Sequence, residues 1–222
     1  MAISEYVAAA IAGNFRVEST VNPGIWESLI PMSWDYQYDY DDPNKGGFGL
    51  GQWTNVGTQY GRLYNLHTWV TANGYADGDG NGQMAYIPVE GVWYAASSQM
   101  GFASLNDFLS STSTDLAGLT LDWMTCWEGL PSSHSSLYDR QMAAATFLPE
   151  IQAHAGDDPS TYVWVSSNAF LGWSDMTNNA ICVFFALNGW TPQPPTPPPG
   201  TLTDEELALM AWLRKRRKWW IT

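Results

Sequence analysis

Apolar residues near the start of the chain recur with a helical period. We predict a helix over residues 4–19, because side chains spaced three or four positions apart share one face of a helix. The stripe consists of Val7, Ile11, Phe15 and Glu18. The residue before a proline avoids helical backbone, so the sequence Asn22-Pro23-Gly24 should end the helix and leave Glu18 in its last turn, on the buried face.

The remaining pattern predicts a mainly α-helical domain with a small β element. Glycine is too dense in GGFGLGQWT, residues 46–54, for a helix, and the segment is typical of a tight β-hairpin or loop. Residues 174–187 contain the apolar run ICVFFAL, which fits a buried strand or a helix. Further helices are predicted at residues 58–73 (with Leu63, Leu66 and Val70 on one side), 83–99, 105–109, 119–127 and 138–155.

The C-terminal segment has a pattern of its own. Proline density in QPPTPPPG, residues 193–200, favours extended polyproline backbone. We therefore predict a domain at 1–190, a Pro-rich linker at 191–200 and an amphipathic basic helix at 201–222. A lone helix of this length is marginal in water, so it should dock on something. Docking on another protein is the favoured interpretation, and peripheral contact of its Trp-flanked basic end with an anionic membrane is the alternative.

Charge is unevenly distributed along the chain, whose net charge is −13. Residues 201–222 carry five basic and three acidic side chains, or +2, and the residues before them carry four basic and nineteen acidic ones, or −15. A body this acidic lacks the basic surface that phosphate binding requires, which argues against nucleic acid as a partner. Its 13 Trp and 11 Tyr side chains supply a core and, in part, flat faces for stacking on a ligand.

No cofactor is expected from the sequence. Cys126 and Cys182 lie outside any metal-ligand pattern, and they form either one disulfide or two buried thiols. Residues 1–13 lack the basic start of a signal peptide, and no apolar run has the length of a transmembrane helix.

One segment resembles the first half of a calcium-binding loop. Asp77, Asp79 and Asn81 have the right spacing, but Pro88 occupies the twelfth position, where an EF-hand needs glutamate. We interpret the segment as an Asx/Gly turn and keep calcium as the minor alternative.

Glu18 is the leading candidate for a catalytic residue. Partial burial and the negative end of the helix dipole both favour a protonated carboxyl group near neutral pH. A general acid that protonates a glycosidic oxygen needs this property. The alternative is a structural glutamate, exposed or paired with Arg16 or Arg62.

Two motifs distinguish between these interpretations. GNFRVESTVNP at 13–23 and GGFGLGQWT at 46–54 together resemble the phage tail lysozyme family, which is related to goose-type lysozymes and soluble lytic transglycosylases. Weaker similarity continues through GRLYNLHTWV, QMAYIPVE, TCWEGLP and DRQMAAATF, to about residue 155. The resemblance implies a mainly α, lysozyme-like α+β fold and Glu18 as the catalytic acid. It places these residues along a sugar-binding cleft: Ser19, Gly49, Leu50, Gln52, Trp53 and Thr54.

A second carboxylate is not settled by the sequence. Asp35, Asp39, Asp41 and Asp42 lie in the aromatic, acidic segment WDYQYDYDD between the two motifs, and each fits either a catalytic role or a solvated loop. Hydrolysis and lytic transglycosylation therefore both remain open.

The resemblance implies that the chain is a phage virion protein of the tail that cleaves the β-1,4 bond between N-acetylmuramic acid and N-acetylglucosamine in bacterial peptidoglycan. Residues 201–222 would attach it to a virion partner at the host cell wall. A free endolysin with the same chemistry is one alternative. A structural or wall-binding virion protein that retains the fold without catalysis is the other.

Overall fold

The computed structural model describes residues 2–29, 46–55 and 61–189. Three predicted features fall wholly or partly outside these residues. They are the acidic segment at 34–42, the linker and helix at 191–222, and the first residues of the helix predicted at 58–73.

Within the described residues, seven α-helices make up most of the regular structure, which confirms the mainly α prediction. They are α1 (Glu5–Ser19), α2 (Arg62–Ala72), α3 (Gly80–Glu90), α4 (Leu105–Leu109), α5 (Leu116–Asp122), α6 (Leu137–His154) and α7 (Trp173–Leu187). Short 3₁₀ turns occur at Glu27–Leu29, Ala95–Ser97 and Pro159–Thr161, and a π-helical turn at Trp123–Trp127. The apolar run at 181–187 is thus helical and forms the end of α7.

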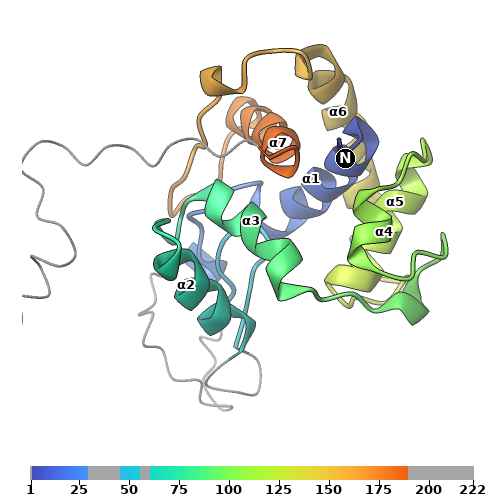
Figure 1. Ribbon diagram of the computed structural model, residues 1–222, viewed down its shortest axis with the longest axis horizontal. Helices are drawn as coiled ribbons and strands as arrows, with labels where there is room; N and C mark the ends of the chain where they lie inside the picture. The colour runs from blue at the N-terminus through green and yellow to red at the C-terminus, as the bar shows by residue number, and fades with distance from the viewer. Residues whose placement is uncertain (1, 30–45, 56–60, 190–222) are drawn as a thin grey trace, which may run out of the picture. The chain divides into compact units, whose positions relative to one another are not determined.

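Helix α1 is the centre of the domain. It packs most extensively against α6, and also against α5 and α7 (Figure 1). Every residue from 7 to 15 is buried, as expected of a helix surrounded by others. The hydroxyl of Ser4 accepts a hydrogen bond from the Val7 amide, 3.3 Å away, and caps the start of the helix. Thr20 adopts left-handed backbone and ends the helix, so the terminating residue precedes the Asn22 that we predicted.

Gly13 allows α6 to approach α1 closely. A Cβ atom at this position would lie 2.6 Å from the carbonyl oxygen of Arg140 and 2.7 Å from the Cβ of Ala144. Only glycine fits at this crossing without moving the α6 backbone. The crossing fixes where Arg140 stands relative to the end of α1.

The glycine-rich segment at 46–54 forms a tight turn, and isolated bridges are the β structure that the described residues contain. Phe48 and Trp53 exchange two backbone hydrogen bonds, of 3.1 and 3.0 Å. Gly49 and Gln52 have positive φ angles of 74° and 47°, which lets the chain reverse between them. Trp26 bridges to Phe48 from the other side and anchors the turn to the segment after α1.

The predicted boundaries of two helices were wrong for local reasons. Helix α3 starts before residue 83, because the Asp79 carboxylate caps it by accepting from the Asn81 amide at 2.8 Å. It ends well before residue 99, because Gly91 adopts left-handed backbone with φ 63°. Helix α5 likewise starts before residue 119, because the Asp115 carboxylate caps it by accepting from the Gly118 amide at 3.0 Å.

The two ends of the described domain lie together. The Ile3 amide donates to the side-chain oxygen of Asn188 at 2.8 Å, and the Asn188 amide group donates back to the Ile3 carbonyl at 3.3 Å. Asn188 is the residue at which α7 ends. This reciprocal pair joins the start of α1 to the end of α7.

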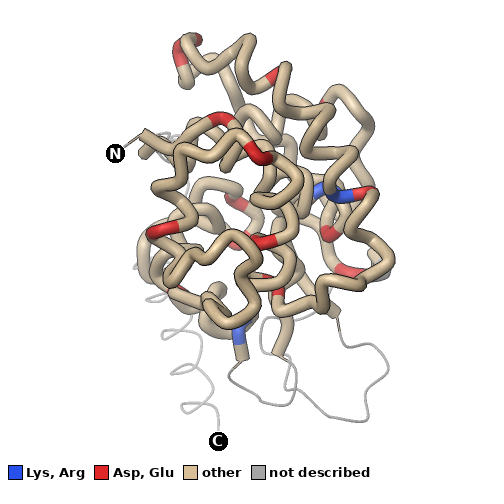
Figure 2. The backbone as a smooth tube through the Cα atoms, turned by 90° about the vertical axis from the view of Figure 1, so that its right-hand side faces the viewer, with Lys and Arg blue, Asp and Glu red and all other residues tan. Residues whose placement is uncertain are grey.

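Acidic positions are spread over the described chain, and basic positions are few (Figure 2). Cys126 and Cys182, left open by the sequence, are both buried free thiols in the described part. Burial raises the pKa of the Cys182 thiol to about 12, so it stays protonated. No helix among the described residues is both long and apolar enough to cross a membrane.

Candidate active site

Glu18 lies in the last turn of α1 with its side chain 24% exposed. The next residue, Ser19, is buried, and its hydroxyl donates to the Leu50 carbonyl at 3.0 Å, which ties the end of α1 to the glycine-rich turn. Thr20 and Val21 both have positive φ, 55° and 54°. β-Branched residues adopt this backbone only at a free-energy cost that the surrounding structure must offset. Glu18 is therefore held at a strained junction between a buried helix and a fixed turn.

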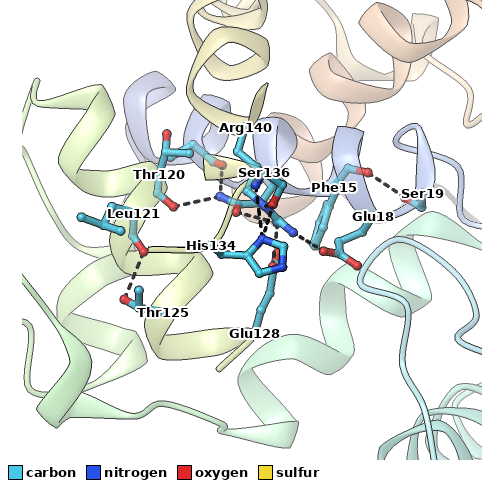
Figure 3. Close-up of polar contacts among 12 residues, drawn as sticks. Phe15, Glu18, Ser19, Thr120, Leu121, Thr125, Glu128, His134, Ser136 and Arg140 are labelled. Atoms are coloured by element: carbon cyan, nitrogen blue, oxygen red, sulfur yellow. Dashed lines mark hydrogen bonds and ion pairs between the residues drawn. The ribbon is translucent and has the colours of Figure 1, made fainter. Parts of the chain in front are cut away.

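The side chain of Glu18 meets a cation that the sequence analysis did not place there. Arg140, from α6, forms an ion pair with Glu18 (Figure 3). Its guanidinium group also donates to Glu128 at 2.6 Å, to the Asn14 side chain at 2.9 Å and to the Ser136 hydroxyl at 2.9 Å. The Arg140 side chain is only 1% exposed, so these four partners replace water around a buried charge.

Glu128 is the second carboxyl group at this cation. Its side chain is 6% exposed, and its Oε2 atom accepts the bond from Arg140. The π-helical turn at Trp123–Trp127 positions it, because the Glu128 amide bonds the carbonyl five residues back, at Trp123. One extra residue in a turn rotates the following side chain by roughly 100° relative to an α-helix. That rotation places Glu128 opposite the end of α1.

Burial raises the pKa of Glu128 well above its ordinary value, and the nearby charge of Glu18 raises it further. The guanidinium group of Arg140 opposes both effects but does not outweigh them. The carboxyl groups of Glu18 and Glu128 accept from the two terminal nitrogens of the same guanidinium group, so they lie close together. The Oε1 atom of Glu128 is buried and has no hydrogen-bond partner among the described residues.

A cleft of about 150 Å³ opens beside these groups. It is lined by Glu18, Gly51, Gln52, Thr54, Arg62, Glu128 and Leu130. The lining combines two carboxyl groups, one guanidinium group and the polar edge of the glycine-rich turn. Such a set can move a proton and hydrogen-bond a polar ligand in a partly shielded space.

The residues that the resemblance placed along the cleft fall into two groups: some line the cleft, and the others are buried. Gln52 and Thr54 line the cleft with Glu18. Gln52 holds the turn closed by donating to the Gly49 carbonyl at 2.9 Å.

The other residues of that set lie behind the cleft surface and are buried. They are Ser19, Gly49, Leu50 and Trp53. The Leu50 amide donates to the Gln83 side chain at 2.8 Å, and the Trp53 indole donates to Glu90 at 3.2 Å. These contacts fix the turn that carries Gln52 and Thr54.

Arg62 also lines the cleft. It pairs with Glu90 through two hydrogen bonds, of 2.6 and 2.9 Å, and its guanidinium carbon stands 4.7 Å from the ring centre of Trp127. Burial lowers the pKa of Arg62, but the hydrogen bond and charge of Glu90 outweigh this and raise it overall. Arg62 thus pairs with Glu90, not with Glu18.

Two further hollows adjoin the cleft and share a wall residue with it. One, of about 570 Å³, meets the cleft at Arg62 and includes Trp69 and Tyr86. The other, of about 540 Å³, meets it at Glu128 and includes Tyr94, which is 56% exposed. The cleft beside Glu18 therefore has a neighbouring hollow at Arg62 and another at Glu128.

The remaining candidates are placed elsewhere or lie outside the described residues. Asp35, Asp39, Asp41 and Asp42 are outside them. In the possible calcium loop, Asp77 pairs with His67 at 2.7 Å, and Asp79 and Asn81 are engaged in the cap of α3. In the part of the chain that the structure describes, no three His, Cys, Asp or Glu side chains are grouped so as to hold a metal ion.

Sequence reasoning did not identify Glu128 and Arg140 individually. Both lie in the weaker segments of the resemblance, TCWEGLP and DRQMAAATF. A usable signal was the scarcity of cations, because only four basic residues precede residue 201 and two of them, Arg62 and Arg140, stand at this site.

No curated protein matches the chain. The family model described as phage tail lysozyme matches residues 2–150 of the 222. That match includes α1, the glycine-rich turn and both residues that the sequence analysis missed. The chain therefore belongs to the phage tail lysozyme family, whose activity is the degradation of peptidoglycan.

Proposed function

We propose that this protein cleaves the β-1,4 bond between N-acetylmuramic acid and N-acetylglucosamine, with Glu18 as the general acid. The observation that carries the proposal is the position of Glu18, a partly exposed carboxyl group at the end of a buried helix, in a cleft whose other wall is the turn at 51–54. A carboxyl group in this setting can donate a proton while its own position stays fixed.

In the proposed reaction, Glu18 transfers its proton to the glycosidic oxygen. The bond from that oxygen to C1 breaks, and its electron pair stays on the leaving oxygen. C1 then takes a hydroxyl group from water, or the 6-hydroxyl oxygen of the same muramic acid residue, and the released proton returns to Glu18. The first outcome is hydrolysis and the second is lytic transglycosylation.

Gln52, Thr54 and the backbone at Gly51 would hold the sugars in register. Their polar groups line the cleft, and glycine lets the main chain approach a polymer closely. Tyr94 and Trp69, in the adjoining hollows, offer aromatic faces on either side of the cleft. An acidic protein gains no long-range attraction to an anionic wall, so these short-range contacts supply the binding.

The test compares wild type with Glu18→Gln on purified cell walls. Loss of a general acid lowers the rate by about 10²–10⁴-fold, so Glu18→Gln should release almost no new glycan ends. Glu150→Gln is the matched control, because Glu150 is an exposed carboxylate on α6, and it should cleave like wild type. If neither wild type nor Glu18→Gln releases new ends, catalysis is refuted and a wall-binding virion protein is favoured. Substantial and equal release by both proteins would instead refute Glu18 as the general acid.

Mass analysis of the released muropeptides separates the two reaction outcomes. A reducing end marks hydrolysis, and an anhydro end, lighter by one water, marks transglycosylation.

We also propose that the protein acts as part of the phage tail during penetration of the cell wall, with residues 201–222 as its attachment to a virion partner. The proline-rich linker and the amphipathic basic pattern support this. A chain truncated after Trp190 should cleave walls normally but be missing from purified virions. Incorporation at the full-length level would contradict the attachment, and loss of membrane binding alone would favour the membrane alternative.

A further inference from the structure

The single positive charge of Arg140 faces two carboxyl groups, Glu18 and Glu128. This imbalance of charge affects whether the proposed acid, Glu18, has a proton to donate. If Glu18 and Glu128 were both ionised, a nearly dry site would hold two negative charges and one positive charge. Water reaches little of it, because the side chains of Arg140 and Glu128 are 1% and 6% exposed. An uncompensated charge in such surroundings is costly, and uptake of a proton removes it.

The hydrogen-bonding pattern indicates where that proton resides. Arg140 donates to Glu18 and to the Oε2 atom of Glu128, which leaves Glu128 Oε1 buried without a partner among the described residues. A proton on Oε1 would make it a donor, and the carboxylate of Glu18, held beside it by the same guanidinium group, would be the acceptor. One proton therefore cancels the excess charge and satisfies the orphaned oxygen at once.

We infer that Glu128 is a positioning residue that shares one proton with Glu18 and so keeps the acid supplied near neutral pH. Of the two groups, Glu18 is the more exposed and is the one proposed to face the glycosidic oxygen. This inference rests on the proposed function of Glu18. Without Glu128, the single charge of Arg140 would be balanced by ionised Glu18, and no proton would be needed.

Among the described residues, the other charged or titratable groups near Glu18 and Glu128 are Arg62, His134 and Tyr94. Arg62 from α2 is matched by Glu90 of α3. His134 is bonded to the Ser136 hydroxyl, which in turn accepts from Arg140. That hydroxyl couples His134 to the trio formed by Arg140, Glu18 and Glu128. Tyr94 lines the hollow on the far side of Glu128. His134 is the group that an experiment must separate from the glutamate pair.

The experiment follows proton uptake directly. The chain has eight glutamates, and selective ¹³C labelling of their carboxyl carbons allows each to be titrated by NMR. In wild type, the coupled pair of Glu18 and Glu128 should show one apparent pKa well above the ordinary glutamate range. It should vanish in Glu128→Gln and move downward in Glu18→Gln, and it should persist unchanged in Glu150→Gln and His134→Gln. The inference is overturned if every glutamate titrates in the ordinary range, or if the high titration survives in Glu128→Gln.

The pH profile of wall cleavage gives the second readout. In Glu128→Gln, the alkaline limb of kcat/KM should move to lower pH by at least about one unit, which is a roughly tenfold loss on that limb. Activity on the acid side should stay close to wild type, and His134→Gln should leave the limb in place. A merely structural role would reduce activity equally at every pH, and a parallel profile would therefore refute the inference. A high titration in a protein that cleaves no wall would instead uphold the shared proton and reject the proposed function.

Discussion

Two arginines stand at the candidate site and differ in how many carboxylates each one meets. Arg62 pairs with Glu90 alone, one charge against one. Arg140 pairs with Glu18 and Glu128, one charge against two. Both arginines are held by short hydrogen bonds, so geometry does not distinguish them. The ratio of charges does, because a matched pair needs no proton and an unmatched trio takes one up.

The comparison shows how one type of interaction can serve two purposes in the same site. The Arg62–Glu90 pair fixes a wall, with the guanidinium over Trp127 and the Trp53 indole bonded to Glu90. The Arg140 trio retains a proton beside the cleft. Removing one carboxyl group from the trio would convert it into a second matched pair.

Removing the cation should give the largest effect. In Arg140→Met, two carboxyl groups lose their shared partner, and breaking a buried ion pair costs about 3–5 kcal/mol. Arg62→Met leaves one buried carboxylate that keeps its bond from the Trp53 indole, so the loss should be about 1–3 kcal/mol. Urea unfolding of both variants measures the difference. Equal losses would contradict the distinction between trio and pair.

Displacing α6 should lower the free energy of unfolding by a smaller amount, and it should disturb Arg140 but not Arg62. Gly13→Ala puts a Cβ atom within 2.6 Å of the Arg140 carbonyl, and overpacking of this kind costs about 1–3 kcal/mol. Because α6 must move, the high carboxyl titration should change as well. Gly156→Ala is the control, since a Cβ there meets no atom within 4 Å, and its unfolding free energy should match wild type. A Gly13→Ala protein as stable as wild type would show that α1 and α6 are not in tight contact.

The pH dependence of stability should give the smallest effect. The pKa of Glu128 is raised in the folded protein, so the folded state binds this proton more tightly than the unfolded state does. The resulting stabilisation is complete below the ordinary glutamate pKa and is lost as pH rises through the raised value. Over that window, wild type should lose on the order of 1 kcal/mol more than Glu128→Gln, measured by urea unfolding at several pH values. Parallel pH dependence in the two proteins would contradict a raised pKa at Glu128.

The sequence could predict what depends on neighbours along the chain. The four-residue spacing of Val7, Ile11 and Phe15 identified the central helix and placed Glu18 at its end, and glycine density identified the turn at 46–54. Helix starts were missed at Asp79 and Asp115, whose carboxylates cap the helix from a position outside the apolar pattern.

What the sequence could not predict depends on residues far apart in the chain. Arg140 is 122 positions from Glu18 and 126 from Asn14, and nothing in its own segment indicates that it would be buried. Glu128 reaches the cleft through a π-helical turn, which shifts the helical phase on which pattern reading relies. The position of Arg140 also depends on the crossing at Gly13, a contact that periodicity alone does not reveal.

The mutual hydrogen bonds of Ile3 and Asn188 bear on how the gene could be rearranged. Because these residues touch, a short peptide could join them without stretching the chain, and new termini could be opened at the exposed Gly156. A circular permutant of this kind would keep Glu18, Glu128 and Arg140 on one uninterrupted stretch of chain. The domain could then be inserted within another protein as a cassette.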